Sequence, residues 1–298
     1  MRNCLEIDSV IAEGVPVYRI VEKKILAPTI TKYVVEAPYV AKKRKPGNFV
    51  IIRVEETGER IPLTLVDSDG AKGTITLIVQ AIGKSTKALA LKNEGDYISD
   101  VMGPLGNPTP IETGKTIACV GGGVGTAELY PITKALKEAG NTIYTIVGAR
   151  SRDLVILEQE MESVSDTCYI TTDDGSYRRK GFVTDQLKEL LDAHFGINMV
   201  YAIGPLPMMK AVSHLTKPYG VRTIVSLNAI MVDGTGMCGG CRVSVNGKMK
   251  FACVDGPEFE GHEVDFDEML LRNRSYAEME KISVERFEHS CRLEGMAQ

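Results

Sequence analysis

Residues 116–126 read Thr-Ile-Ala-Cys-Val-Gly-Gly-Gly-Val-Gly-Thr, and this stretch decides the fold of the central part of the chain. Thr116–Val120 is a β-rich apolar run, a glycine cluster follows it directly, and Ala127–Ala139 has helical periodicity that stops at Gly140. A strand, a glycine turn and a helix in this order place free backbone N–H groups where they can bind a phosphate. The sequence therefore predicts a dinucleotide-binding loop, with the candidate residues Gly121, Gly122, Gly123, Val124, Gly125 and Thr126.

The alternation of strands and helices continues as far as residue 225. The later expected strands are Thr142–Val147, Cys168–Thr172, Met199–Ile203 and Arg222–Val225, and the expected helices are Asp153–Met161, Val183–Ala193 and Met208–Thr216. Such alternation predicts a parallel sheet, whose ligands bind at the carboxyl ends of its strands. Three more loops fall at those ends, at Gly148–Arg152, Asp173–Ser176 and Gly204–Met208. A single nucleotide cleft would explain all four loops, and it makes Arg150 and Asp174 candidate binding residues.

The first third of the chain consists of short β-rich runs separated by proline and glycine. The expected strands are Val17–Ile25, Ile30–Glu36, Phe49–Val54, Ile61–Val66, Gly73–Val79 and Tyr97–Val101, with one helix at Lys87–Lys92. This spacing predicts a small antiparallel barrel. Arg60–Thr64 places a base and a hydroxyl on one strand, and Ile82–Thr86 places a glycine, a base and two hydroxyls at a helix start, which suits a pyrophosphate. A capped helix and a solvated strand end explain the same residues.

A third pattern lies at Asp233–Cys253, which reads DGTGMCGGCRVSVNGKMKFAC. Cys238 and Cys241 form a C-x-x-C pair, and the Asn246-Gly247 turn signal predicts a hairpin that returns Cys253 to them. A thiol redox pair is disfavoured, because such pairs occur at a strand-to-helix step. Three thiolates and a carboxylate can hold either zinc or an iron–sulfur cluster, and the stretch by itself leaves both open.

Composition limits the class of protein. The chain has 298 residues, 44% hydrophobic and 25% charged, with a net charge of −4. These values describe an ordinary globular protein of about two domains and argue against nucleic acid as the main partner. We expect neither a membrane span nor a signal peptide, because no apolar run is long enough. Seven cysteines without a disulfide pattern indicate a cytoplasmic protein.

The order of a barrel, a nucleotide-binding sheet and a cysteine loop resembles the ferredoxin–NADP reductase superfamily. More narrowly, the chain is similar to electron-transfer subunits related to that of dihydroorotate dehydrogenase. It is also similar to the small subunits of NADH-dependent ferredoxin:NADP oxidoreductases. These subunits have a second name, sulfide dehydrogenase small subunits. The resemblance extends from about Ile20 to Asp267, and residues 231–257 are its most specific part.

The resemblance assigns residues to cofactors. The family's Arg-Pro-x-Ser flavin strand falls on residues 61–64, with Ile61 at the arginine position and Arg60 one residue earlier, and its phosphate loop falls on residues 83–86. The motif beside the nicotinamide falls on residues 203–208, where Ile203 replaces a cysteine. The implied FAD contacts are Arg60, Ile61, Pro62, Leu63, Thr64, Gly83, Lys84, Ser85 and Thr86, and the implied nicotinamide dinucleotide contacts are residues 121–126, Gly204, Pro205 and Met208.

At the cysteine loop the related subunits use four cysteines, and the first aligns with Asp233. The resemblance thus implies a [2Fe–2S] cluster held by Asp233, Cys238, Cys241 and Cys253, and it favours this cluster over zinc. A carboxylate is a harder ligand than a thiolate and changes the charge and potential of such a cluster.

The implied function is electron transfer from NADH through FAD and the cluster to a larger flavin or iron–sulfur subunit, as a heterodimer. Arg150 and Arg152 could bind NADP, but Asp153 and Glu158 lie nearby, and the family favours NAD(H). Two alternatives stay open. One is the dihydroorotate dehydrogenase subunit itself, against which Asp233 argues, and the other is a non-catalytic nucleotide-binding module that carries zinc.

We expect four parts: a FAD-binding barrel at residues 1–102, a NAD-binding α/β domain at 103–225, a [2Fe–2S]-binding segment at 226–264, and a helical tail at 265–298. The tail either packs on its own chain or docks to the larger subunit.

Overall fold

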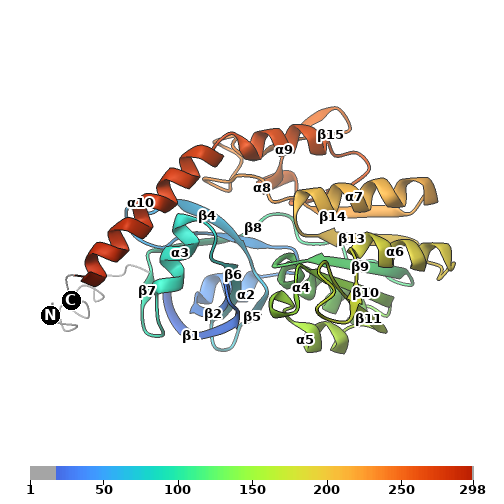
Figure 1. Ribbon diagram of the computed structural model, residues 1–298, viewed down its shortest axis with the longest axis horizontal. Helices are drawn as coiled ribbons and strands as arrows, with labels where there is room; N and C mark the ends of the chain where they lie inside the picture. The colour runs from blue at the N-terminus through green and yellow to red at the C-terminus, as the bar shows by residue number, and fades with distance from the viewer. Residues whose placement is uncertain (1–17, 297–298) are drawn as a thin grey trace.

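The computed structural model describes the backbone of residues 18–296 and the side chains of residues 18–290. Cys4 and the expected strand start at Val17 lie outside the described residues, and so does the side chain of Cys291. Along this range the predicted order of an antiparallel barrel, a largely parallel sheet and a cysteine-bearing hairpin is confirmed (Figure 1).

Two antiparallel sheets form the barrel. Within residues 18–105, one sheet has five strands in the order β5-β6-β2-β1-β7 and the other has three in the order β4-β3-β8. The strands are β1 (Tyr18–Ala27), β2 (Ile30–Glu36), β3 (Phe49–Arg53), β4 (Arg60–Thr64), β5 (Asp67–Asp69), β6 (Thr74–Gln80), β7 (Tyr97–Ile98) and β8 (Asp100–Leu105). Alternate side chains of β6, Ile75, Leu77 and Val79, are buried in the barrel core, as expected of a strand with one face inward.

Two helices of the barrel differ from the prediction. α2 (Pro38–Lys43) was not expected, although its proline suits a first helical turn. α3 (Lys84–Leu91) begins three residues before the expected Lys87, because the Thr86 hydroxyl accepts hydrogen bonds from the N–H groups of Ile82 and Gly83. These bonds cap the helix at Gly83 and bring Lys84 into its first turn.

The second sheet has seven strands within the described residues, in the order β12-β11-β10-β9-β13-β14-β17. They are β9 (Thr116–Gly122), β10 (Thr142–Ala149), β11 (Thr167–Thr172), β12 (Arg179–Lys180), β13 (Met199–Ile203), β14 (Arg222–Ser226) and β17 (Glu258–Glu260). The five expected strands are all present and parallel, and the additional edge strand β17 pairs antiparallel with β14.

Helices cover both faces of this sheet: α4 (Gly125–Glu138), α5 (Glu158–Ser163), α6 (Val183–Asp192) and α7 (Leu206–Thr216). Along β9, Cys119 packs in one core with Leu129 of α4, whereas Val120 packs in another with Leu187 of α6. Burial on both faces explains why this strand is a continuous apolar run.

The expected helix at Asp153–Met161 is wrong. The chain forms a short 3₁₀ turn, η3 (Arg152–Leu154), and α5 begins only at Glu158. Leu157 has a φ of 57°, a left-handed conformation that cannot continue a right-handed helix.

The expected hairpin is present as β15 (Arg242–Val245) and β16 (Lys248–Phe251). Asn246 and Gly247 have φ values of 50° and 68°, as a type I′ turn requires. The short helix α8 (Ala252–Asp255) follows and carries Cys253. Cys241 and Cys253 lie in the same buried core as Val225 of the parallel sheet, so the hairpin packs on that sheet.

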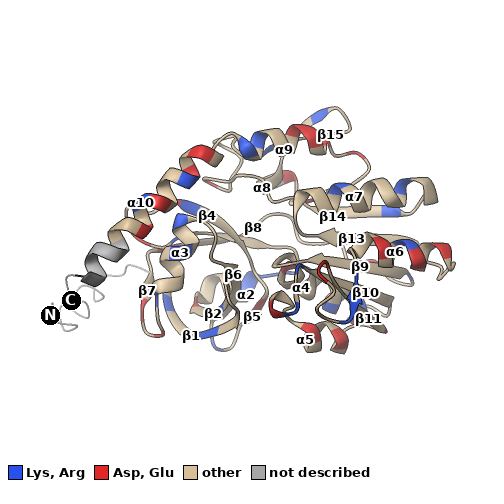
Figure 2. Cartoon of the chain, viewed as in Figure 1, with Lys and Arg blue, Asp and Glu red and all other residues tan. Residues whose placement is uncertain are grey.

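The tail is helical, as predicted, and forms α9 (Phe266–Arg274) and α10 (Ala277–Met296). α10 lies along α3 of the barrel (Figure 1), where Lys87 forms an ion pair with Glu288. Residues of both charge signs follow one another along α10 (Figure 2). Over residues 18–296, the helices are too short or too polar to span a membrane.

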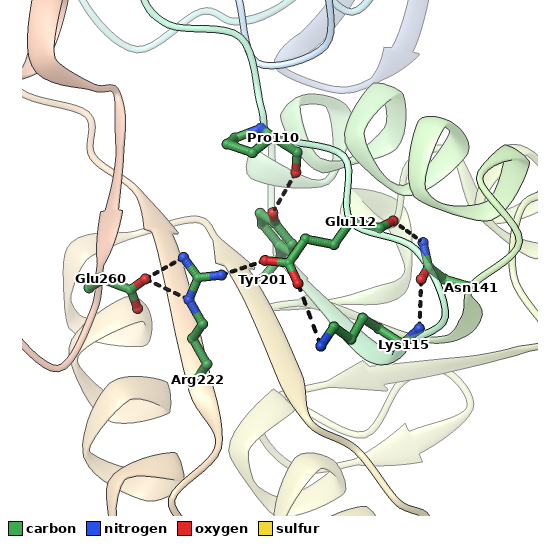
Figure 3. A network of polar contacts seen from close by, with 7 residues as sticks. All are labelled: Pro110, Glu112, Lys115, Asn141, Tyr201, Arg222 and Glu260. Atoms are coloured by element: carbon green, nitrogen blue, oxygen red, sulfur yellow. Dashed lines mark hydrogen bonds and ion pairs between the residues drawn. The ribbon is translucent and has the colours of Figure 1, made fainter.

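The linker from the barrel to the second sheet, residues 107–115, is held by polar contacts (Figure 3). Arg222 of β14 forms ion pairs with Glu112 of the linker and Glu260 of β17. Asn141 donates from Nδ2 to the Glu112 carbonyl at 2.7 Å. These contacts fix the linker to the parallel sheet and its antiparallel edge.

Candidate functional site

A large cavity lies between β4, the start of α3, the cysteine loop and the tail helices. Its volume is about 1470 Å³, whereas small-molecule sites usually measure roughly 300–1,000 Å³. The expected flavin contacts that line it are Arg60, Ile61, Pro62, Gly83, Lys84, Ser85 and Thr86. The cysteine loop reaches the same cavity at Cys238, Gly239 and Gly240. The cavity is therefore large enough for an extended dinucleotide and borders the cysteine loop.

At the start of α3, the backbone N–H groups and the Lys84 side chain can bind an anion in this cavity. The Thr86 hydroxyl is engaged with the backbone of Ile82 and Gly83, and the Ser85 hydroxyl donates to Glu59 Oε2 at 3.0 Å. The first-turn N–H groups have no acceptor within the helix, and the Lys84 side chain borders the cavity. The chemistry of a pyrophosphate site is thus present, with the hydroxyls stabilising the loop.

Arg60 is held at the edge of the same cavity. Its Nη2 atom lies 3.4 Å from Asp100 Oδ2, so β8, on the other side of β3 in the same sheet, orients its guanidinium. Leu63 and Thr64 lie farther along β4 and do not line the cavity. Burial raises the pKa of the Glu128 carboxyl in α4, and the neighbouring Thr64 side chain lowers it.

The tail supplies cavity residues that sequence reasoning missed. Arg272 of α9 and Lys281 of α10 line the cavity together with Tyr276, which lies between the two helices. Arg272 also donates from Nη2 to the carbonyl of Gly240 in the cysteine loop at 3.3 Å. The sequence shows only a charged helix here, and nothing in its pattern indicates that the helix folds back over β4 and α3.

The predicted glycine loop and the Gly204–Met208 loop lie against each other. A Cβ on Gly125 would be 2.6 Å from the Ile203 carbonyl oxygen, and a Cβ on Gly122 would overlap Met208 Sδ. Gly123 has a φ of 55°. Glycine is needed here for close backbone approach and for the left-handed turn, and the two loops together form the carboxyl edge of β9 and β13.

The other two strand-end loops also meet. The N–H of Asp174 donates to the Arg150 carbonyl at 3.2 Å. The Asp174 carboxylate accepts hydrogen bonds from the Ser176 side chain and backbone, which hold its pKa below the usual range. Both residues are exposed, at the edge where a nucleotide would lie.

Charges beside this edge are paired. Tyr177 lies between Arg152 and Arg178, whose guanidinium carbons are 5.2 and 5.3 Å from its ring centre. Arg178 Nη2 lies 3.0 Å from Glu158 Oε1, and the Tyr177 hydroxyl donates to the same carboxylate. Glu158 therefore offsets the positive charge that would attract a 2′-phosphate.

Among the cysteine-loop candidates, Cys241 and Cys253 are brought together, with their sulfur atoms 3.2 Å apart. Burial and the hydrogen bond with Cys241 raise the pKa of the Cys253 thiol. The Asp233 carboxylate accepts from the N–H groups of Thr235 and Cys238, at 2.8 and 2.7 Å. These bonds hold the pKa of Asp233 below its usual range.

The carboxylate and the three thiols are ligand types that suit an iron–sulfur cluster, and two of the thiols already lie close together. Two thiolates on one tetrahedral ion with bonds of about 2.3 Å are roughly 3.8 Å apart, so the Cys241–Cys253 pair needs only a small displacement. Cys238 is exposed, and its sulfur accepts from the N–H of Gly240 at 3.4 Å. Side chains described in the structure do not place three or more His, Cys, Asp or Glu groups around one metal position. A bound cluster would have to draw Asp233 and Cys238 toward the buried pair.

Comparison with known proteins bears on the same segments. A family model described as the iron–sulfur cluster binding domain of dihydroorotate dehydrogenase B matches residues 228–265, and one described as an oxidoreductase NAD-binding domain matches residues 119–214. A Thermotoga maritima protein named dihydroorotate dehydrogenase B (NAD(+)), electron transfer subunit homolog is 51% identical over 274 residues, 92% of this chain and 96% of the relative. The chain belongs to the family of dihydroorotate dehydrogenase B electron transfer subunits.

Two further members show how this family relates to the present chain. The electron transfer subunit from Bacillus velezensis is 37% identical over 250 residues, 80% of this chain and 94% of the relative. A solved chain of the NADH-dependent reduced ferredoxin-NADP oxidoreductase, reported for its insights into flavin-based electron bifurcation, is 50% identical with a TM-score of 0.87 and covers 92% of this chain and 99% of its own length. The predicted resemblance is thereby confirmed.

Proposed function

We propose that this chain is an electron-transfer flavoprotein subunit that passes electrons between NAD(H), FAD and a [2Fe–2S] cluster, and to or from a larger partner subunit. The cavity that touches both the flavin strand and Cys238 carries this proposal. FAD, when bound, can accept a hydride from nicotinamide and release single electrons. The match to an iron–sulfur cluster domain favours the cluster over zinc.

In this proposal the residues have separate roles. Lys84 and the first turn of α3 hold the FAD pyrophosphate, and Arg60, Ile61 and Pro62, which line the cavity, hold the flavin. Residues 121–126 with Gly204, Pro205 and Met208 hold the nicotinamide dinucleotide, while Arg150 and Asp174 lie on its ribose side. Asp233, Cys238, Cys241 and Cys253 are the cluster ligands.

We also propose the division of the chain at about residues 102, 225 and 264, because a segment with its own expected cofactor or role follows each boundary. Since β8 ends at Leu105 and β14 at Ser226, the first two boundaries belong just after those residues. A cytoplasmic location is proposed from the cysteines. The five whose side chains are described are all free thiols, as in proteins of reducing compartments.

Two kinds of partner compete. The similarity to a chain of the ferredoxin-NADP oxidoreductase, over 99% of that chain's length, supports a partner of that type. The relatives named for dihydroorotate dehydrogenase B support a partner that oxidises dihydroorotate. Asp233 in place of a cysteine favours the first.

The test is to purify the protein without oxygen and measure its FAD, iron and acid-labile sulfide. The proposal predicts one FAD and one two-iron cluster for each chain. It also predicts that the copurifying larger subunit couples NADH oxidation to ferredoxin and NADP rather than to orotate. A colourless chain that binds zinc, and still does so after anaerobic treatment with iron and sulfide, would refute it.

A further inference from the structure

A second cavity lies between α3 and α10, next to the larger cavity that borders the cysteine loop. Its volume is about 550 Å³, and small-molecule sites usually measure roughly 300–1,000 Å³. Lys84 of α3 lines it together with Met279, Ile282, Ser283, Arg286, Phe287 and Ser290 of α10. Lys84, Met279 and Ser283 line both cavities, so the two adjoin at the start of α3.

One face of α10 forms the wall of the second cavity. The lining residues recur at spacings of three and four between 279 and 290, and helix positions with that spacing are neighbours on one face. Lys87 of α3 pairs with Glu288 of α10, which holds the two helices side by side (Figure 1). The tail therefore presents a continuous face to the start of α3.

This face carries large apolar side chains that the protein itself covers poorly. Met279 is 69% exposed and Ile282 is 41% exposed, while Phe287 is partly buried. Ligand sites are lined mainly by apolar and aromatic side chains, with a few polar groups that orient the ligand. A flat aromatic base is the kind of group that packs on such a surface.

The charged residues that line the second cavity, Lys84 and Arg286, are both basic. Neither forms an ion pair among the described side chains, since the ion pairs of these two helices engage Lys87 and Lys281 instead. Lysine and arginine bind phosphate through charge-assisted hydrogen bonds. The second cavity thus combines an apolar wall with two cations, which is the chemistry of a nucleotide rather than of a purely apolar ligand.

The order of the groups in FAD gives this cavity an occupant, if the proposed function holds. The flavin then lies beside β4 and the cysteine loop, and the pyrophosphate lies at Lys84. An extended FAD carries its adenosine on the opposite side of the pyrophosphate from the flavin. Along α10 the larger cavity reaches only Glu285, whereas the second cavity continues to Ser290. The adenosine would therefore enter the second cavity.

We propose that the second cavity is the adenosine subsite of FAD and that α10 supplies most of it. Ile282 and Phe287 cover the adenine, and Arg286 binds the adenylate phosphate. The matched domains, residues 119–214 and 228–265, leave α10 outside, so this subsite is a feature of the tail. The competing explanation is that the apolar face of α10 contacts the larger partner subunit and does not touch FAD.

The test compares FAD with FMN, which lacks the adenylate group. Flavin is removed from the anaerobically purified full-length protein, and each flavin is titrated back while its fluorescence is measured. The wild type should bind FAD more tightly than FMN. Arg286→Gln and Ile282→Gln should each weaken FAD binding by about tenfold, through the loss of a charge-assisted hydrogen bond and of apolar contact respectively, and should leave the Kd of FMN unchanged.

Two variants on α9 are matched controls. Arg274→Gln and Leu271→Gln make the same kinds of change at exposed positions that line neither cavity, and both should keep the wild-type Kd of FAD and FMN. A positional test uses FAD with a photoreactive azido group on C8 of the adenine. Its label should be found in peptides that contain residues 279–290.

The outcomes separate this proposal from the proposed function. A wild type that binds FAD and FMN equally, an equal loss of both flavins in the α10 variants, or a label confined to peptides outside α10 would overturn the adenosine subsite and leave the flavin assignment intact. A full-length protein that binds neither FAD nor FMN would refute the proposed function itself.

Discussion

Replacing Glu258 by Gln should change how the stability of the protein depends on pH. Burial raises the Glu258 pKa from its ordinary value of 4.5 to about 7. The folded protein then binds more protons than the unfolded chain between these values, so wild-type stability falls as pH rises from about 4.5 to about 7 and levels off above. The difference of about 2.5, at 1.36 kcal/mol for each pKa unit, corresponds to about 3 kcal/mol as an upper bound.

Glutamine cannot ionise, so this part of the pH dependence should vanish in Glu258→Gln. Urea unfolding of both proteins between about pH 5 and about pH 8 measures this loss of pH dependence. Over that range the free energy of unfolding of Glu258→Gln should rise by about 2–3 kcal/mol relative to that of the wild type. A constant offset from the amide group does not affect this slope. Glu189→Gln should leave the slope over this range as in the wild type, because Arg179 holds the pKa of Glu189 below its usual range and this carboxyl therefore stays ionised in the folded protein throughout. Parallel curves for wild type and Glu258→Gln would show that this carboxyl is not buried as described.

Three further substitutions test the cofactor sites. Cys253→Ser should abolish the two-iron cluster. The control Cys168→Ser alters a free thiol in β11, far from the cysteine loop in sequence, and should keep the iron content. Equal iron contents in the two variants would show that Cys253 is not a cluster ligand. Arg272→Gln should weaken FAD retention by about tenfold, the loss of one charge-assisted hydrogen bond, and unchanged flavin content after gel filtration would contradict a role for the tail in the cavity. Glu158→Gln should remove the nearer carboxylate partner of Arg178, leaving Glu162 at 3.9 Å, and should raise the NADPH-to-NADH ratio of kcat/KM about tenfold. An unaltered ratio would show that Glu158 does not select the cofactor.

The sequence predicted the elements whose residues carry their own local signal. The run from Thr116 to Thr126 specified a strand, a turn and a helix, and Asn246-Gly247 specified the hairpin that brings Cys253 to Cys241. In each case the turn chemistry and the apolar period agree, so that little depends on distant contacts. The helix predicted at Asp153–Met161 was wrong: the spacing of its apolar residues is helical, but Leu157 adopts a left-handed backbone conformation that this spacing does not indicate.

The rest of the site depends on tertiary packing that no local pattern encodes. Strand β17 joins the parallel sheet from about thirty residues beyond β14, and its pairing places Glu258 opposite Ser226. The tail helices fold back over α3, so Arg272 enters the flavin cavity. Both arrangements come from contacts between segments far apart in the chain.

The proposed function requires electrons to pass from NADH through FAD to a two-iron cluster in this single chain. Its most direct test is an absorption and EPR titration of the anaerobically purified protein with NADH. We expect bleaching of the flavin bands together with the EPR signal of one reduced [2Fe–2S] centre, and we expect this signal to be lost in Cys253→Ser. Flavin bleaching without any cluster signal, in a protein shown to contain iron and sulfide, would contradict it.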